Sequence, residues 1–390
     1  MKKKLLFVCP SLGSGGAEKS LVTLLQKIDY AQYDVDLFLF RSEGLFVPLI
    51  PAQVRVLDCG ADYRMFDGSI KPSILYFLRR GKPGTALRRM RYARLASRSH
   101  DMAQIWPYLS AVLPKLSGVY DTAIAYLEGP ATYFVVDHVQ AKRKIAFLHI
   151  DYDFIAYRQA FDARYYQQID LLASVSEECC AKAEQYFPCL RGKVRHMPNI
   201  VLPSFIRQMA QQEAAFPDAG GSTILLTVGR LTVQKRLDRA VDACALLTKR
   251  GYDVRWYVIG VGALESALRE QVQSLGLQDR FIFLGEQSNP YPYMRACDIY
   301  AQTSQFEGKS IAIDEAKCLA KPIVVTNFET VYDQITDGVN GVITEMEPEA
   351  IAQHIAALID DPQRRQALSA ELAREKVGNE EEIQRFYDML

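Results

Sequence analysis

The stretch that decides the fold is Thr303-Ser304-Gln305-Phe306-Glu307-Gly308-Lys309-Ser310, together with the run Ile311 to Ala320 that follows it. The segment before it, Asp298 to Gln302, is short and bounded by polar residues, which predicts a buried strand. Glu307-Gly308 predicts a loop, and Ser310 is a favourable helix N-cap residue ahead of apolar residues at helical spacing. A strand, a loop and a helix are therefore expected in succession.

This arrangement suits a ligand that carries both a phosphate and hydroxyl groups. A helix that opens directly off a strand offers free backbone N–H groups and the positive end of a dipole, which together bind anions. Glu307 lies in the loop before the expected helix start, and Glu315 lies one to two turns inside the helix. A nucleotide-sugar is such a ligand. The alternative is an ordinary strand–loop–helix with two surface acids.

A longer pattern extends these two glutamates. Glu307-Gly308 and Glu315-Ala316 are followed by KPIVVT at 321–326 and DGVNGV at 337–342, and the whole resembles the donor-site signature of retaining family 4 glycosyltransferases with the GT-B fold. The spacing of the two acids alone is common by chance, whereas the complete pattern is specific. The resemblance covers almost the entire chain, and it is weakest from Asp58 to Pro114, where the acceptor would be chosen.

Length and composition bound the fold and the class of protein. A chain of 390 residues is too long for one ordinary domain, and its apolar content of 49% supports large cores. The formal net charge of zero points to no nucleic-acid partner. The chain has no run of eighteen apolar residues, so no membrane span is expected. Met1 to Pro10 has too short an apolar run for a signal peptide, so a first buried strand is expected. The eight scattered cysteines favour reduced thiols in a cytosolic protein.

Two sets of strands alternate with helices, which predicts an α/β protein of two doubly wound Rossmann-like domains facing a cleft. The expected N-terminal, acceptor-binding domain spans residues 1–200, and the expected C-terminal, donor-binding domain spans 201–372. The resemblance implies that a last helix, within 373–390, packs back on the N-terminal domain.

The first strand leads into a glycine-rich loop. Pro10 to Glu18 contains Gly13, Gly15 and Gly16, and glycines at a helix start let the backbone approach a ligand closely. Glu18 replaces the last glycine of the dinucleotide fingerprint. The loop resembles the one that faces the donor diphosphate in the glycosyltransferase family, so Gly15 and Gly16 are expected donor-binding residues. A tight turn without a ligand is the alternative.

Residues 68–100 carry basic and apolar side chains with no acid among them. A basic, aromatic-containing amphipathic stretch suits an anionic bilayer surface, so residues 71–98 are expected to contact a membrane and the acceptor to be lipid-linked. A solvated helical face, an RNA-binding patch and a site for a polyanionic soluble acceptor are the alternatives.

His149 ends a predicted strand, Lys144 to His149. Ligands of open parallel sheets gather at the carboxyl ends of strands, so His149 is expected to face the ligand, and the resemblance places it near the transferred sugar. A core histidine is the alternative. Asp151-Tyr152-Asp153 spells a D-x-D metal motif, but Asp34-Val35-Asp36 matches it as well. Family members that resemble this chain need no metal, so neither a metal nor another cofactor is expected.

The predicted strand Thr223 to Val228 leads into Gly229-Arg230-Leu231 and then Lys235. Arg230 and Lys235 can grip adjacent phosphates, and their arrangement matches the family's diphosphate-binding pair. A solvated basic turn is the alternative. Another strand is predicted from Phe281 to Gly285, with Glu286 after it, and the resemblance places Gly285 and Glu286 beside the nucleobase and ribose.

The resemblance implies a role for each of the remaining residues. Arg230 and Lys235 would stabilise the leaving diphosphate, with backbone donors from the helix start at Ser310 and Ile311. Glu315 would bind the ribose, and Glu307 would contact the sugar beside His149 as a catalytic residue. Retention is expected by front-face attack, and double displacement with Glu307 as nucleophile is the rival. Lys309 stands where many relatives have an apolar residue, and it is expected either to contact the donor or to be solvated.

The expected function is transfer of a sugar from a nucleoside-diphosphate sugar, UDP rather than GDP, to a glycan or lipid-linked acceptor in surface polysaccharide synthesis. The enzyme is expected in the cytoplasm or on the inner face of the cell membrane. A GT-B nucleotide-sugar epimerase would need no basic stretch at 71–98. A non-catalytic sugar-nucleotide-binding subunit should lack one of Arg230, Lys235, Glu307 and Glu315, and this chain keeps all four.

Overall fold

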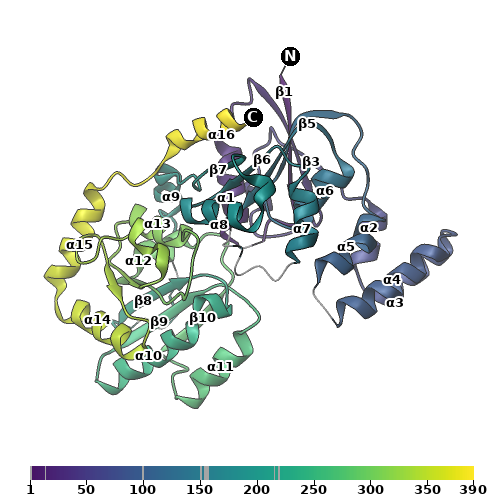
Figure 1. Cartoon of the computed structure of the whole chain (residues 1–390). Coiled ribbons are helices and arrows are strands. Elements are labelled where there is room, and N and C mark those ends of the chain that lie inside the picture. The colour runs from purple at the N-terminus through teal and green to yellow at the C-terminus, as the bar shows by residue number, and fades with distance from the viewer. Residues whose placement is uncertain are drawn as a thin grey trace. The chain divides into compact units, whose positions relative to one another are not determined.

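The computed structural model describes residues 2–13, 15–98, 101–149, 152, 158–214, 216–217 and 220–390. The chain forms two compact units, each with its own sheet. The first unit comprises Met1–Gly13, Ala17–Pro198 and Glu382–Leu390, and the second comprises Ser14–Gly16 and Asn199–Glu381. Figure 1 shows the helices and strands of both units. The expected α/β architecture with two Rossmann-like sheets is confirmed.

The first unit holds a seven-stranded sheet in the order β3-β2-β1-β4-β5-β6-β7, and every pairing in it is parallel. Parallel strands covered on both faces read as continuous apolar runs, and Leu5 to Cys9 of β1 are fully buried for this reason. The strands are β1 (Lys3–Cys9), β2 (Tyr33–Leu39), β3 (Arg55–Leu57), β4 (Val119–Ala125), β5 (Gln140–Leu148), β6 (Leu171–Ser174) and β7 (Val194–His196).

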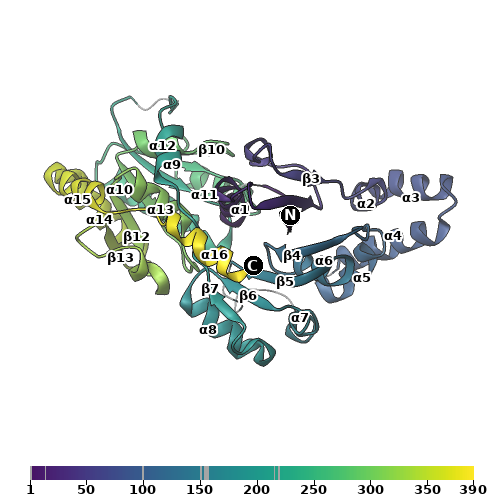
Figure 2. The same cartoon turned by 90° about the horizontal axis from the view of Figure 1, so that it is seen from above.

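Helices connect these strands, as parallel pairing requires. They are α1 (Gly16–Lys27), α2 (Ala61–Asp67), α3 (Ile70–Arg79), α4 (Pro83–Ala96), α5 (Met102–Ser110), α6 (Pro130–His138), α7 (Gln159–Tyr166) and α8 (Glu177–Tyr186). The crossover from β3 to β4 is unusually long because it contains α2 to α5. Within it, α3 and α4 lie side by side and extend away from the sheet of their own unit (Figure 2).

The chain ends in α16 (Ile383–Met389), which belongs to the first unit although all of the second unit precedes it. Phe386 is fully buried and stacks on Phe7 of β1, with ring centroids 5.9 Å apart. Tyr387 stacks on Tyr33 at 5.4 Å, and its hydroxyl accepts a hydrogen bond from the Asp29 backbone N–H at 2.8 Å. These contacts tie the C-terminus to the first sheet.

The second unit holds a six-stranded parallel sheet in the order β10-β9-β8-β11-β12-β13. Its strands are β8 (Thr223–Val228), β9 (Val254–Ile259), β10 (Phe281–Gly285), β11 (Ile299–Gln302), β12 (Ile323–Thr326) and β13 (Val342–Thr344). Its helices are α9 (Pro203–Met209), α10 (Leu237–Lys249), α11 (Glu265–Ser274), α12 (Tyr291–Ala296), α13 (Ile311–Cys318), α14 (Pro348–Asp360) and α15 (Pro362–Arg374).

The apolar runs located the strands correctly, and the ends differ by a few residues. β8 and β10 have the predicted bounds, whereas β5 starts at Gln140 rather than Lys144 because its first residues, although partly exposed, still pair with β4. The helix after Ser310 stops at Cys318, two residues before the predicted end, and Ala320 then adopts a positive φ of 50°. Each of the eight cysteines is free. Within the described ranges, we found no helix of sufficient length and apolarity to cross a bilayer.

The anchoring of α16 is testable by truncating its buried ring. We expect Phe386→Ala to destabilise the first unit by about 3–5 kcal/mol, because a fully buried phenyl group leaves a cavity on removal. Thermal or urea unfolding measures the loss. Gln384→Ala, on the exposed side of the same helix, is the control and should change stability by less than about 0.5 kcal/mol. Equal effects of the two substitutions would contradict the anchoring of α16 through Phe386.

Candidate active site

The sheet order of the second unit places two loops side by side. Strand order reverses between β8 and β11, which are paired neighbours, and ligands of doubly wound sheets bind beyond the carboxyl ends of strands at such a point. The loop after β8 carries Arg230 and Lys235, and the loop after β11 carries Glu307. The predicted phosphate-gripping pair and the predicted sugar-contacting glutamate are thus brought together by the topology.

Glycines let the loop after β8 pack closely against the end of β9. A Cβ atom on Gly260 would lie 2.0 Å from the Gly229 carbonyl oxygen, and one on Gly262 would lie 2.4 Å from the Leu231 carbonyl oxygen. Backbone hydrogen bonds from Gly229 and Leu231 to Ile259 and Val261 fix the same contact. Gly229 also gives space to Lys235, whose Cε would lie 3.2 Å from a Cβ at that position. The position of Arg230 is therefore set by close backbone packing.

The two predicted phosphate ligands differ in their surroundings. Arg230 is exposed, and no hydrogen bond or ion pair of its guanidinium occurs within the described ranges. Lys235 ends the short 3-10 helix Val233–Lys235, and its Nζ lies 2.5 Å from Glu307 Oε1. This ion pair is largely buried, with 16% of the lysine side chain and 8% of the glutamate side chain exposed. Arg230 is open to an anionic ligand, while Lys235 is held by Glu307.

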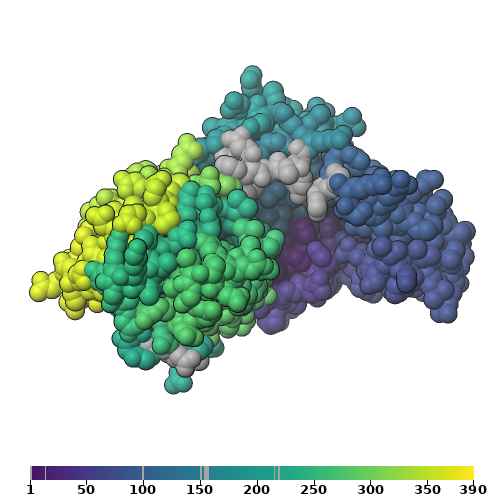
Figure 3. Space-filling model, turned by 90° about the horizontal axis from the view of Figure 1, so that it is seen from below, coloured from purple at the N-terminus to yellow at the C-terminus, as the bar shows by residue number. Residues whose placement is uncertain are grey.

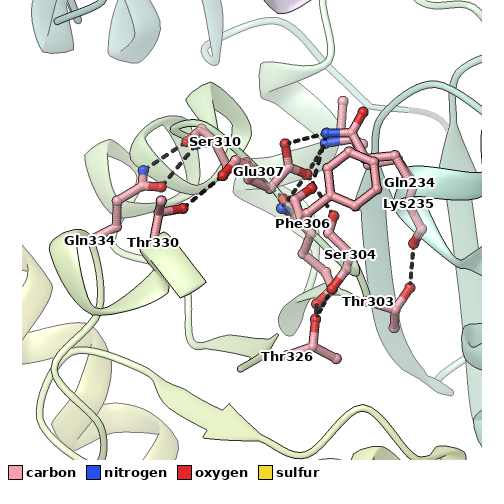
Figure 4. Close-up of polar contacts among 12 residues, drawn as sticks. Gln234, Lys235, Thr303, Ser304, Phe306, Glu307, Ser310, Thr326, Thr330 and Gln334 are labelled. Atoms are coloured by element: carbon pink, nitrogen blue, oxygen red, sulfur yellow. Dashed lines mark hydrogen bonds and ion pairs between the residues drawn. The ribbon is translucent and has the colours of Figure 1, made fainter. Parts of the chain in front are cut away.

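Glu307 accepts four hydrogen bonds from side chains, and they are distributed unequally over its two oxygens (Figure 4). Oε1 accepts from Lys235 Nζ, from Ser304 Oγ at 2.6 Å and from Gln302 Nε2 at 3.2 Å. Among the residues that the structure describes, Oε2 accepts from Gln234 Nε2 alone, at 3.0 Å. An ionised carboxylate has about four acceptor positions on its two oxygens. Oε1 is therefore saturated, and the remaining acceptor capacity lies on Oε2.

The backbone of the Glu307 loop is held by side chains from other elements. Thr326 Oγ1 donates to the Ser304 carbonyl at 2.6 Å, and Thr330 Oγ1 donates to the Glu307 carbonyl at 2.9 Å. Gln234 Nε2 donates to the Phe306 carbonyl at 3.0 Å. Figure 4 shows these contacts converging on the loop from both sides. Such fixed backbone groups give the Glu307 carboxylate a defined position before any ligand binds.

Ser310 occupies the N-cap position of α13, as predicted, but its side chain does not cap the helix. Its hydroxyl donates to Gln302 Oε1 at 2.9 Å, and its backbone N–H donates to Gln334 Oε1 at 2.9 Å. Gln334 Nε2 in turn donates to the Ser310 carbonyl at 2.8 Å. The Ser310 N–H is therefore engaged. The next amides of α13, from Ile311 onward, have no intrahelical acceptor because they belong to the first turn.

Inside the helix, Glu315 is buried and its Oε1 accepts a hydrogen bond from the Tyr291 hydroxyl at 3.0 Å. Lys309 Nζ lies 3.8 Å from Asp314 Oδ2, so Lys309 has an ionic partner and is not simply solvated. Burial raises the pKa of Asp314, and the neighbouring Lys309 ammonium counteracts this rise. Glu307 and Glu315, the two carboxylates predicted from the motif, are thus both held by polar contacts.

The remaining predicted donor-binding residues lie at other strand ends. Gly285 has a φ of +67° and its carbonyl accepts from the Gly260 N–H at 2.8 Å, and the exposed Glu286 follows it. Gly285 is the last residue of edge strand β10, which lies two strands away from β8 in the sheet. Gly15 and Gly16 stand between β1 and the body of α1, and Gly16 is the first residue of that helix.

His149 follows β5 in the first unit, as predicted, and is enclosed by aromatic rings. Its ring lies 5.0 Å from that of Tyr126 and 5.7 Å from that of Phe147. Its backbone N–H donates to Glu128 Oε2 at 3.3 Å, while its Nε2 is buried and has no hydrogen-bond partner within the described ranges. Burial lowers the pKa of His149 to about 4, so its imidazole is neutral near pH 7.

Of the two D-x-D motifs in the sequence, the structure describes the aspartates of one. Asp151 and Asp153 lie outside the described residues. Asp36, from the second motif, is on β2 and pairs with Arg55 and the Tyr120 hydroxyl, so it serves the sheet of the first unit. Within the described ranges, no cluster of three or more histidine, cysteine, aspartate and glutamate side chains could hold a metal.

Sequence reasoning missed the neutral side chains that hold the charged ones. Gln302, Gln334 and Tyr291 are each buried, and each hydrogen-bonds a residue of the predicted motif. One signal was present: Gln302 is a polar residue at the end of an otherwise apolar strand, and a buried amide requires partners. The partners of Gln334 could not have been found, because 24 positions separate it from Ser310.

Known proteins resemble the chain over its second unit and over its full length. The family described as "Glycosyl transferases group 1" matches residues 209–374. An N-acetylgalactosaminyltransferase of Campylobacter jejuni, which acts on a diphospho-undecaprenol-linked sugar, is 25% identical over 372 residues, covering 94% of this chain and 93% of its own. The alpha-D-kanosaminyltransferase of Streptomyces kanamyceticus is 29% identical over 154 residues, which are 38% of this chain and 40% of that enzyme.

A solved structure has the same fold. HepE of Anabaena, in complex with UDP-glucose, superimposes with a TM-score of 0.68 at 19% identity, covering 99% of this chain and 100% of its own. At this identity the likeness establishes the fold alone.

The environment of His149 predicts a pH dependence of stability. Its pKa is about 4 in the folded chain and near 6.5 when unfolded, so below pH 6.5 the unfolded chain takes up a proton that the folded chain does not. The free energy of unfolding therefore falls with the pH, and this group accounts for about 2–3 kcal/mol of the decrease between pH 6.5 and 4.5. We expect His149→Gln to remove that part of the loss in unfolding titrations. The same substitution at His354 is the control. If His149→Gln lost as much stability between pH 6.5 and 4.5 as the wild type does, the lowered pKa of His149 would be contradicted.

Proposed function

The chain belongs to the group 1 glycosyltransferases of family 4 with the GT-B fold, and we propose that it is a retaining enzyme that uses a UDP-sugar and a lipid-linked glycan acceptor. The protein is thus a nucleotide-sugar glycosyltransferase of polysaccharide or glycan biosynthesis. The observation that carries the proposal is the convergence of Arg230, Lys235 and Glu307 at the point where the strand order of the second sheet reverses.

The proposed donor site uses the charge distribution of these loops. Arg230 is exposed and available to the diphosphate, and Lys235 lies farther along the same loop after β8. As the bond to the sugar breaks, negative charge grows on the diphosphate, and fixed cations there stabilise the transition state. The first amides of α13, from Ile311, add donors at the positive end of the helix dipole, and Glu315 binds the ribose hydroxyls.

The preference for uridine is proposed from similarity. HepE, which shares the fold over the whole chain, was solved with UDP-glucose. Gly285 and Glu286 would lie beside the nucleoside, and Gly15 and Gly16 would face the diphosphate.

The hydrogen bonds of Glu307 favour a supporting role over a nucleophilic one. A nucleophilic carboxylate needs an oxygen with a free lone pair facing the sugar, and four donors already reduce the charge available on this group. Oε2, with a single donor, can accept a hydrogen bond from a sugar hydroxyl. We therefore propose front-face attack by the acceptor, with Glu307 orienting the sugar. For His149 the proposed role is a hydrogen bond between its neutral imidazole and a substrate hydroxyl.

The proposed acceptor and membrane contact rest on α3 and α4. Leu75, Leu78, Leu87 and Met90 are between 45% and 51% exposed, which is unusual for large apolar side chains in one hairpin. Exposed basic residues surround them, including Lys71, Arg79, Arg80, Lys82, Arg88, Arg91, Arg94 and Arg98. Figure 3 shows the residues of this hairpin, in blue, gathered in one lobe of the first unit. An anionic bilayer bearing a lipid-linked acceptor fits this surface, which supports the proposal that the enzyme works at the inner face of the membrane.

Nucleotide binding tests the donor site directly. At about a hundred times its dissociation constant, UDP should add roughly 2.7 kcal/mol of stability, visible as a raised melting temperature. We expect UDP to stabilise the wild type more than GDP, ADP or CMP do, and to lose this effect in Arg230→Ala and Glu315→Ala. Arg295→Ala, an exposed arginine on α12 of the same unit, is the control. A wild type that no nucleotide stabilises would overturn the proposal.

Vesicle binding tests the membrane surface. We expect the protein to sediment with vesicles rich in phosphatidylserine or phosphatidylglycerol and to stay in solution with phosphatidylcholine. Reversing Arg88, Arg91 and Arg94 to Glu should weaken binding by at least ~100-fold, since each cation near an anionic surface contributes about 1 kcal/mol. The same reversal at three exposed arginines elsewhere, Arg191, Arg364 and Arg374, is matched in charge. Equal loss in both triple variants would show that net charge, not this hairpin, binds the membrane.

A further inference from the structure

We propose that Gln302 is a positioning residue, whose single buried amide fixes both the Glu307 carboxylate and the start of α13 for the transfer reaction. The inference rests on the proposed function, because it takes Glu307 to contact the sugar and α13 to face the diphosphate. Gln302 itself touches neither and acts through the two groups that it holds.

The geometry of the amide supports this role. Gln302 is the last residue of β11 and is 2% exposed. Its Nε2 donates to Glu307 Oε1 at 3.2 Å, and its Oε1 accepts from Ser310 Oγ at 2.9 Å and from the Tyr300 hydroxyl at 3.1 Å. Glu307 lies in the middle of the loop and Ser310 lies at its end. One planar group of fixed size therefore sets the separation between the carboxylate and the helix start.

Packing alone gives no reason for an amide at this position. Its neighbours in the sheet, Ala301, Val324 and Val325, are apolar and buried, and an apolar residue at 302 would carry no desolvation cost. Burial of the amide is offset by three of the four hydrogen bonds that such a group can form. The hydrogen bonds also fix its orientation: turned end for end, the amide would place its oxygen against Glu307 Oε1, and two acceptors would face each other.

The proposed role becomes important when the donor binds. Lys235 is both the ionic partner of Glu307 and a proposed ligand of the diphosphate. If Lys235 turns to the diphosphate, Glu307 keeps three neutral donors, from Gln302, Ser304 and Gln234. These donors hold the carboxylate in place without opposing the negative charge that develops on the leaving group. Gln302 is the one among them that also ties Glu307 to α13.

The test compares Gln302→Met, which keeps the length of the side chain and removes the amide, with Tyr300→Phe. The control removes the third hydrogen bond of Gln302, together with the 3.5 Å contact of the Tyr300 hydroxyl with the Val228 carbonyl, from a buried position on the same strand. We expect kcat to fall roughly 10- to 100-fold in Gln302→Met, since a displacement of about 1 Å in a catalytic group has effects of this size. The affinity for UDP should stay within about threefold of wild type. Tyr300→Phe should retain the wild-type kcat.

A second variant gives a readout that lost packing would not produce. In Gln302→Glu, the introduced carboxyl faces Glu307 Oε1, and two carboxylates at hydrogen-bond distance share a proton, so that one of their pKa values rises. Only the protonated form can donate to Glu307. We expect kcat of Gln302→Glu to rise as the pH falls from 8 to 6, unlike that of wild type. A kcat of Gln302→Met within twofold of wild type, or parallel pH profiles of Gln302→Glu and wild type, would overturn the proposal.

Failure of the positioning role of Gln302 can be distinguished from failure of the proposed function. A wild type that binds no nucleotide would refute the donor site, and the positioning role would then be judged from crystal structures. In Gln302→Met, a displaced Glu307 carboxylate and Ser310 hydroxyl would support the role of the amide, and unchanged positions of both groups would overturn it.

Discussion

The polar architecture of the second unit depends on the burial of the Glu307 carboxylate beside Lys235. Only 8% of the glutamate side chain is exposed, and a buried charge is strongly unfavourable unless it is paired and hydrogen-bonded. One cation and three neutral donors meet this requirement. The four donors come from three places in the chain, so satisfying the carboxylate fixes the loop after β8, the end of β11 and the loop after it relative to one another.

The same requirement explains how the loop after β11 is held in place without regular secondary structure. Its carbonyl groups cannot pair within a sheet or helix, and an unpaired backbone group in a buried place is costly. Threonine and glutamine side chains from β12 and the segment after it supply the missing donors. Because these elements also pair or pack within the core of the second unit, the position of Glu307 is coupled to the stability of that core.

The first unit shows a different balance between stability and function. Its central sheet and α16 are held by apolar burial and ring stacking, as in the contact of Phe386 with Phe7. In the α3–α4 hairpin, by contrast, leucine and methionine side chains are exposed to solvent among arginines. Exposed apolar patches of this kind mark surfaces that contact a partner or a membrane, which is the contact proposed for this hairpin. The long crossover between β3 and β4 makes such an element possible without disturbing the sheet.

The sequence by itself determined the fold class, the positions of the strands and the residues that carry charge at the candidate site. Apolar runs that alternate with helical periods indicate parallel sheets with helices on both faces. Glu307, Glu315, Arg230 and Lys235 stand out because they follow such runs. Strand ends were less certain, since partly exposed residues such as those at the start of β5 pair without an apolar signal.

Only the tertiary structure decided what these charged residues contact. The pairing of Lys235 with Glu307 joins positions 72 residues apart, and the engagement of the Ser310 N–H by Gln334 joins positions 24 apart. Local patterns carry no information about such partners, because hydrogen bonds between distant residues depend on strand order and helix packing. The helix start at Ser310 was predictable from the sequence, but its reduced number of free amides was not. Buried neutral side chains, Gln302 above all, determine how the predicted charges are arranged.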